Sequence, residues 1–137
     1  MESQQVKGSR VLAVDSAKTW EFVIGQAQIQ ACPVVIHFTA VWCAPSKFMK
    51  GFFEELALKY PDILFLSVDV DELKSVAEKL DVKAMPTFLF MKEDYNQAAD
   101  KIVGANAEEL HKRVAHFAQM SRQGSQDATS PKFSGVL

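Results

Sequence analysis

The segment Val34–Thr39 constrains the fold more than any other part of the chain. Nearly every residue in it is β-branched or aromatic. A continuous run of this kind is typical of a strand that is buried on both faces of its sheet. A segment with helical spacing of apolar residues, 43–60, follows after a short connection. Because a strand buried on both faces needs layers above and below it, we predict an α/β fold with this strand near its centre.

Strand-like and helix-like segments alternate along the rest of the chain. Short apolar runs predict strands, and apolar residues at helical spacing predict helices capped by Asp15 or Ser16 and by Asp71. The strands are expected at 10–14, 63–69, 87–91 and 98–103, and the helices at 16–28, 73–80 and 107–120. The order β-α-β-α-β-α-β-β-α implies parallel βαβ units followed by a hairpin and a final helix. We therefore expect a mixed central sheet flanked by helices on both faces.

The length of 137 residues suits one domain. We expect this domain to span 10–120. Residues 1–9 are polar and predict a flexible N-terminus. Residues 121–137 are rich in Ser, Gly and Gln and predict a disordered C-terminal tail.

Charge and hydropathy argue against several classes of protein. The formal net charge is −2, whereas a nucleic-acid-binding protein usually carries a basic excess. No apolar run approaches the ~18 residues of a membrane span, and the first residues lack the features of a secretory signal. Two cysteines are too few for a four-cysteine zinc site, and His111 and His116 do not share a helix face. We expect a cytoplasmic monomer without metal, nucleic-acid partner or membrane contact.

The two cysteines, Cys32 and Cys43, lie in different positions relative to the central strand. Cys43 stands where the strand has ended and the helix begins, so backbone N–H groups and the helix dipole favour its thiolate. A thiolate is the nucleophile of disulfide exchange. About six extended residues at ~3.3 Å each separate the two cysteines by roughly 20 Å, too far for a disulfide. Cys32 is thus an inert thiol or an intermolecular one, and we favour the inert reading.

Several ordered motifs resemble those of thioredoxins, in particular the plant cytosolic h type. The resemblance covers about 11–120 and implies a thioredoxin-like fold. Its closest match is with the monocysteine thioredoxin-like proteins of plants, whose site reads Trp-Cys-x-x-Ser. The motifs are Phe38-Thr39-Ala40 before Trp42-Cys43, Val68-Asp69-Val70-Asp71-Glu72, Ala84-Met85-Pro86-Thr87-Phe88-Leu89-Phe90, and Val103-Gly104-Ala105.

The resemblance also implies roles for individual residues. Cys43 matches the attacking cysteine, and Pro86 matches a cis-proline that faces it. The substrate-contact surface of the family corresponds here to apolar residues around the thiol. These are Trp42, Ala44, Pro45, Met85, Pro86, Gly104 and Ala105.

Three polar positions depart from the family pattern. Ser46 stands at the position of the resolving cysteine, and a hydroxyl group cannot form a disulfide. His37 replaces a buried aspartate that serves the resolving thiol, and Ser67 replaces its lysine partner. We favour an inert or helix-capping Ser46 over a nucleophile. For His37, we favour a core histidine over a proton relay beneath Cys43.

A single reactive thiol predicts monothiol thiol–disulfide exchange through Cys43, with weak isomerase activity or glutathione-dependent reduction. Protein disulfides or glutathionylated proteins are the expected partners, and glutathione is the expected co-substrate, with no other cofactor. A covalent dimer through Cys32 or Cys43 remains open. The alternative function is a non-catalytic binding, redox-sensing or chaperone-like module that traps clients through Cys43. A third, weaker reading is an iron–sulfur cluster held by Cys43 and glutathione, as in monothiol glutaredoxins.

Overall fold

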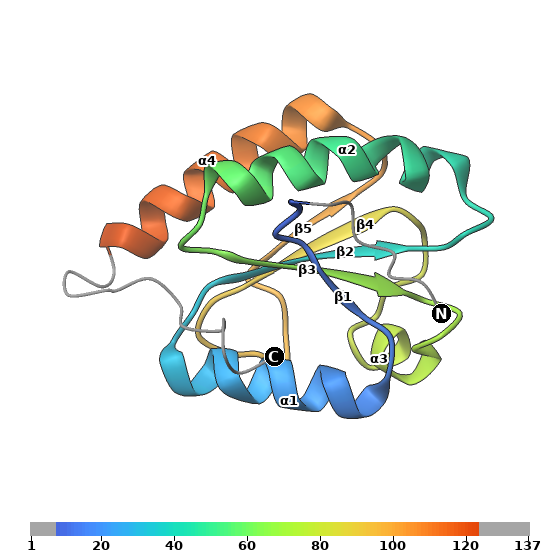
Figure 1. Cartoon of the computed structure of the whole chain (residues 1–137), viewed down its shortest axis with the longest axis horizontal. Helices are drawn as coiled ribbons and strands as arrows, with labels where there is room; N and C mark the ends of the chain where they lie inside the picture. The colour runs from blue at the N-terminus through green and yellow to red at the C-terminus, as the bar shows by residue number, and fades with distance from the viewer. Residues whose placement is uncertain (1–7, 124–137) are drawn as a thin grey trace.

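A computed structural model describes residues 8–123, and the order of its elements is the one predicted (Figure 1). The strands are β1 (Leu12–Val14), β2 (Val34–Thr39), β3 (Leu64–Asp69), β4 (Thr87–Met91) and β5 (Asp100–Val103). The helices are α1 (Ala17–Gln30), α2 (Ala44–Lys59), α3 (Lys74–Lys79) and α4 (Ala107–Gln123). None of the helices described is long and apolar enough to cross a membrane.

The five strands form one mixed sheet in the order β1-β3-β2-β4-β5. β1, β3 and β2 run parallel, whereas β4 is antiparallel to both β2 and β5. The central position predicted for Val34–Thr39 is therefore confirmed. Its neighbours place Ser67 and Phe88 on either side of His37 in the sheet register.

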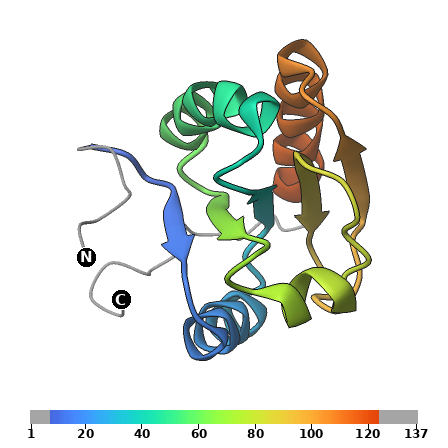
Figure 2. The same ribbon diagram turned by 90° about the vertical axis from the view of Figure 1, so that its right-hand side faces the viewer.

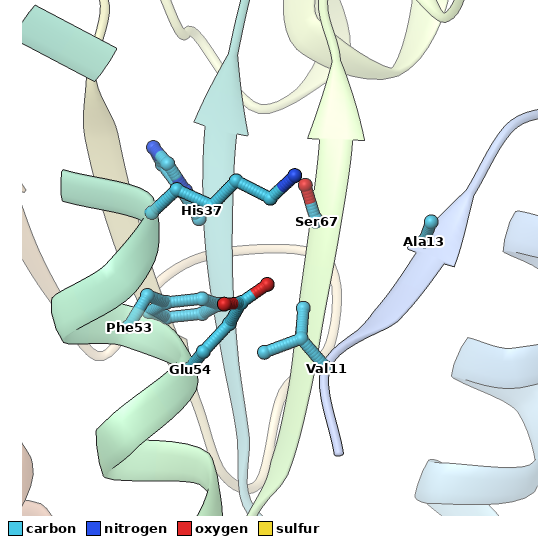
Figure 3. Close-up of a pocket in the computed structure, with 7 residues that line it drawn as sticks. Val11, Ala13, His37, Phe53, Glu54 and Ser67 are labelled. Atoms are coloured by element: carbon cyan, nitrogen blue, oxygen red, sulfur yellow. The ribbon is translucent and has the colours of Figure 1, made fainter. Parts of the chain in front are cut away.

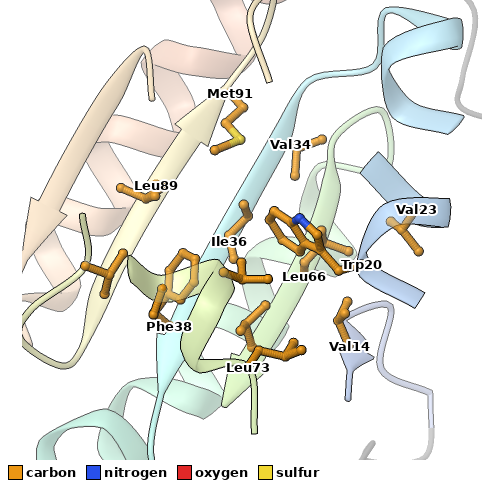
Figure 4. Packing of buried hydrophobic residues seen from close by; sticks show 14 of the residues in the cluster. Val14, Trp20, Val23, Val34, Ile36, Phe38, Leu66, Leu73, Leu89 and Met91 are labelled. Carbon is orange, nitrogen blue, oxygen red and sulfur yellow. The ribbon is translucent and has the colours of Figure 1, made fainter. Parts of the chain in front are cut away.

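Helices cover both faces of the sheet, with α1 and α3 on one face and α2 and α4 on the other (Figures 1 and 2). Each face carries its own apolar core. Figure 4 shows the first, where Trp20 and Val23 of α1 pack near Ile36 and Leu66 of the sheet. The second contains Phe53 of α2 together with residues of α4 and of the other side of the sheet. Burial of β2 by both layers explains why its sequence is apolar apart from His37 and the terminal Thr39.

The helix ends follow the predicted caps in one case and not in the other. The Ser16 hydroxyl accepts a hydrogen bond from the backbone N–H of Thr19 at 3.1 Å, so the cap of α1 is confirmed. The predicted cap at Asp71 is wrong. Leu73 stands at the N-cap of α3 and makes no side-chain capping bond. The carboxylate of Asp71 is instead bound to a side chain from another loop, which is described below.

The C-terminal boundary also differs from the prediction. Helix α4 continues to Gln123, so residues 121–123, which the composition assigns to the tail, are helical. The physical reason is that Ser121, Arg122 and Gln123 contain no helix breaker, and the first glycine comes at Gly124. The rest of the predicted tail, 124–137, and residues 1–7 of the predicted flexible N-terminus lie outside the described residues.

Candidate active site

Cys43 occupies the N-cap of α2, directly after the loop that leaves the central strand. Its backbone is extended, with φ −101° and ψ 102°, and Pro45 lies in the first turn of the helix. The Cys43 side chain makes no capping hydrogen bond and is buried. The thiol therefore stands at the positive end of the helix without being used to hold the helix together.

The loop before β4 meets Cys43. β4 runs antiparallel to β2, and Thr87 at its start pairs with Phe38 near the end of β2. The Met85–Pro86 peptide bond just before it is cis. The thiol of Cys43 donates to the backbone oxygen of Met85, with an Sγ to O distance of 3.5 Å. A backbone group of this loop thus lies at the sulfur.

The β5–α4 loop joins the same edge of the sheet. The backbone N–H of Gly104 donates to the oxygen of Pro86 at 2.9 Å. Gly104 has a φ of 115°, in a region that side chains rarely adopt, so glycine is needed here. Ala105 beside it is exposed, as are Ala44 and Pro45 at the start of α2. The structure therefore brings the predicted contact residues around Cys43 from three separate loops.

Trp42 is held at the rim of the site by Asp71, which the sequence predicts as a helix cap. The indole Nε1–H of Trp42 donates to Oδ2 of Asp71 at 2.7 Å. Asp71 is positioned in turn by its own N–H, which donates to Oδ1 of Asp69 at 2.8 Å. This contact forms because Asp69 is the register partner of Thr39, so the two strands end side by side. The register is the signal that a single sequence lacks.

Ser46 is fully buried and belongs to a chain of three polar side chains. Its hydroxyl donates to Oγ1 of Thr39 at 2.6 Å, and its oxygen lies 3.1 Å from Nε2 of His37. When the Ser46 hydroxyl donates to Thr39, its oxygen can accept a hydrogen bond from Nε2–H of His37. Both hydrogen bonds point into the protein, which fits the structural role favoured for Ser46. The part played by Thr39 was missed, since a threonine within a strand run looks like an ordinary strand residue.

His37 is buried among aromatic rings. Its imidazole stacks on Phe88 with ring centroids 4.7 Å apart, and its edge meets Phe53 at 5.3 Å. Burial, with a smaller contribution from the positive charge of Lys50, lowers the pKa of His37 from 6.5 to about 4. His37 is therefore neutral near pH 7. Among the described contacts, the His37 side chain hydrogen-bonds to Ser46, whereas the Cys43 thiol hydrogen-bonds to the backbone oxygen of Met85.

A small cavity of about 50 Å³ lies beside His37, between α2 and the β1 side of the sheet (Figure 3). It has room for water-sized molecules but not for a peptide. Lys50 of α2, which is not among the residues predicted for the site, also lines this cavity. The lining residues are Val11, Ala13, His37, Lys50, Phe53, Glu54 and Ser67.

The lowered pKa of His37 predicts a pH-dependent loss of stability. The unfolded chain binds this proton more tightly than the folded one, so the stabilisation is complete above pH 6.5 and is lost as the pH falls towards 4. Between pH 7 and pH 5, the wild type should lose about 2 kcal/mol more unfolding free energy than His37→Gln. Urea unfolding at both pH values measures this difference. Equal losses in the two proteins would mean that folding leaves the pKa of His37 unchanged.

Cys32 lies at the other end of β2 and is buried. Its thiol donates to the backbone oxygen of Pro33 at 3.4 Å, and burial raises its pKa to about 12. The phenol of Tyr95 donates to the backbone oxygen of Cys32 and covers it from the β4–β5 loop. Such a thiol stays protonated, so the geometry supports the inert reading of Cys32 over an intermolecular one.

Within residues 8–123, no three histidine, cysteine or acidic side chains gather closely enough to hold a metal ion. At this edge of the sheet, the Cys43 thiol stands at a helix N-terminus. That thiol faces a backbone oxygen and is surrounded by small and apolar side chains.

Comparison with known proteins identifies the family. The thioredoxin family model matches residues 11–116. A thioredoxin-like protein CXXS1 of Arabidopsis thaliana is 60% identical over 83% of this chain and 95% of its own length. Thioredoxin H1 of the same plant is 46% identical over 80% of this chain and 95% of its own. The expected resemblance to plant thioredoxins is therefore confirmed.

Solved structures agree with the sequence relatives. A crystal structure of a thioredoxin h mutant from poplar superposes with a TM-score of 0.76 and 35% identity, covering 82% of this chain and 85% of that one. A thioredoxin from Nicotiana alata gives a TM-score of 0.77 and 34% identity, covering 84% and 98%. The fold, the thiol at the end of the central strand and these relatives agree, and the chain belongs to the thioredoxin family of thiol–disulfide oxidoreductases, which act on protein disulfides.

Proposed function

We propose that this protein is a monothiol exchanger, in which Cys43 carries out disulfide exchange without a resolving cysteine. One observation carries the proposal. The Cys43 thiol lies at the N-terminus of α2, 3.5 Å from the oxygen of Met85, while position 46 holds a buried serine bound to Thr39 and His37. The second cysteine of the chain is buried at the far end of β2 and is kept protonated by its surroundings.

The first step is attack of the Cys43 thiolate on one sulfur of a client disulfide. A bond forms between Cys43 and that sulfur, the client S–S bond breaks, and the other client sulfur leaves as a thiolate that takes a proton from water. The client is now attached through a mixed disulfide. Ser46 cannot displace it, because an oxygen in this position offers no thiolate to attack Cys43.

Release then depends on a thiol from elsewhere. If another thiolate of the client attacks the mixed disulfide, the client gains a rearranged disulfide, Cys43 returns as a thiolate, and no electrons are lost or gained overall. If the client was a glutathionylated protein, glutathione attacks the Cys43–glutathione adduct and leaves as glutathione disulfide. Both routes suit a reducing compartment, and we propose the cytoplasm.

The test is the refolding of a protein with scrambled disulfides in a glutathione buffer. The wild type should accelerate recovery of the native disulfides, whereas Cys43→Ser should return the rate to that of buffer alone. Cys32→Ser is the matched control, since it removes the other thiol of the chain and should leave the acceleration unchanged. Equal rates with the wild type and Cys43→Ser would refute the proposal.

The absence of a thiol at position 46 also favours a second function, in which the mixed disulfide persists and the protein acts as a trap. The same experiment separates the two. A trap would form as much mixed disulfide between Cys43 and its clients as an exchanger does, but it would not accelerate their refolding. Suppression of aggregation that survives Cys43→Ser would indicate a chaperone-like module that does not need the thiol.

A further inference from the structure

Four large apolar side chains close to Cys43 in sequence are exposed. Val41 and Trp42 precede the thiol and are 70% and 64% exposed. Phe48 and Phe52 follow it on α2 and are 62% and 38% exposed. Contiguous exposed apolar surface is uncommon in soluble proteins and usually marks a site of interaction. We call Phe48 and Phe52 the α2 aromatic pair.

The α2 aromatic pair is preformed. The two residues are four positions apart on the helix, and their rings meet edge to face with centroids 5.3 Å apart. Aromatic side chains ordered in this way contribute large contact area and lose little conformational entropy on binding. The pair is therefore a ready surface rather than two separate side chains.

The direction of the α2 aromatic pair follows from helix geometry. Lys50 lines the cavity on the β1 side of α2 (Figure 3). Phe48 and Phe52 are each two residues away from Lys50. A separation of two residues places side chains about 160° apart around the helix axis. They therefore lie on the opposite flank, towards α4, whose residues share the second core with α2. Helix α4 begins directly after the Gly104–Ala105 loop that is tied to Pro86 (Figure 2).

The spacing along α2 suits a client segment next to its disulfide. Phe48 and Phe52 are five and nine residues beyond Cys43, or about 7 and 13 Å along a helix axis. An extended polypeptide at ~3.3 Å per residue covers these distances in roughly two to four residues. These axial distances are the least that a client segment must span, so the side chains two to four positions from its attacked cysteine are the nearest that can reach the pair.

The exposed apolar area around Cys43 is small, which favours a covalently held client over a second copy of this chain. Four partly exposed side chains offer at most several hundred Å², below the roughly 800 Å² per partner of a stable interface. A client attached through Cys43 needs a much smaller contact area, because the attachment raises the effective concentration of the client at this surface to the millimolar range. Weak apolar contacts then suffice to select and orient the segment.

We propose that the α2 aromatic pair extends the client-binding surface of Cys43 and selects disulfides flanked, two to four residues from the attacked cysteine, by large apolar side chains. Such segments are buried in native proteins and exposed in unfolded ones. The selected clients are therefore unfolded or misfolded chains with wrong disulfides. This inference rests on the proposed function, because it requires Cys43 to hold a client.

The test compares two disulfide peptides that are identical except for leucine or serine at the positions two to four residues from one cysteine. The readout is the ratio of their rates of mixed-disulfide formation with Cys43, so that changes in the intrinsic reactivity of the thiol cancel. The wild type should prefer the leucine peptide by roughly tenfold, and the double variant Phe48→Ser/Phe52→Ser should bring the ratio close to one.

The matched control is Phe22→Ser/Ile29→Ser on α1. These residues are 42% and 78% exposed but cover the opposite face of the sheet (Figure 1). Their removal should leave the ratio as in the wild type. Melting curves by circular dichroism check folding, and the single variant Phe48→Ser gives a smaller loss of preference if the double variant does not fold.

The outcomes separate the two proposals. If Cys43 of the wild type forms no mixed disulfide with either peptide, the proposed function fails. If it reacts with both but shows no preference, or the α2 double variant keeps the preference, only the inference about the pair is overturned. The inference about the pair is also overturned if the α1 double variant loses as much preference for the leucine peptide as the α2 double variant does. Sedimentation that finds a wild-type dimer broken by the α2 variant would assign the pair to self-association instead.

Discussion

Replacing Ser46 by cysteine is expected to shorten the lifetime of a mixed disulfide at Cys43 by a factor of about 100 or more. Position 46 lies in the first turn of α2, one helical turn after Cys43. A thiolate there attacks the Cys43 sulfur within one molecule, and such reactions have effective concentrations far above millimolar glutathione. The wild type holds a serine in this place, so its adduct waits for an external thiol.

The measurement starts from the protein with glutathione attached to Cys43 and no free thiol in solution. In Ser46→Cys, the introduced thiolate attacks the Cys43 sulfur, an internal disulfide forms, and glutathione leaves as a thiol. Mass spectrometry follows both products with time. The wild-type adduct should persist throughout.

A control separates the position of the new thiol from its mere presence. Gln28→Cys adds an exposed cysteine on α1, on the other side of the sheet from α2. It should release glutathione as slowly as the wild type does. Slow release from Ser46→Cys as well would mean that the inward hydrogen-bonding position of residue 46 keeps a thiol from reaching Cys43.

Truncating Phe53 is expected to have the largest effect on stability. Its ring lies at the centre of an aromatic cluster beneath α2, with centroids 5.2 Å from Phe65, 5.3 Å from His37 and 5.7 Å from Phe88. Phe53→Ala removes these contacts and leaves a cavity, which typically costs about 3–5 kcal/mol. For a domain of this size the Tm should fall by roughly 10–15 °C.

Phe48→Ala is the matched control for this prediction, because the same substitution is made on the same helix at an exposed position. Its unfolding free energy should change by no more than about 0.5 kcal/mol. Urea unfolding followed by circular dichroism measures both variants. A loss below about 1 kcal/mol in Phe53→Ala would show that the cluster refills the space.

Much of the fold could be predicted because local patterns report burial. The unbroken run of β2 and the helical spacing in α2 and α4 reflect which faces are covered, so the order of elements and the central strand were predicted correctly. The ends of the helices were harder to predict. The end of α4 and the cap of α3 depend on a few weak local preferences, and these placed residues 121–123 and Asp71 wrongly.

The residues of the active site likewise fall into those that the sequence identified and those that only the structure revealed. Cys43 was identified from the sequence pattern, because a strand that leads directly into a helix puts the next cysteine at the helix start. Ser46 and His37 were singled out by the resemblance to thioredoxins. The partners of these residues were not all identified. The resemblance placed the loop of Met85 and Pro86 at the thiol. The Met85 oxygen at the sulfur, Thr39 beside Ser46 and Lys50 beside His37 appear only in the structure.

The sequence by itself determined the alternation of strands and helices, the place of the reactive thiol and the lack of a second thiol one turn later. Those features depend on neighbouring residues and on the chemical identity of single side chains. Only the tertiary structure decided that Asp71 binds the Trp42 indole, that the Gly104 loop joins Pro86, and that the α2 aromatic pair lies exposed towards α4. The physical reason is that these contacts join segments far apart in the chain. Their formation depends on strand order, register and helix orientation, which no local pattern contains.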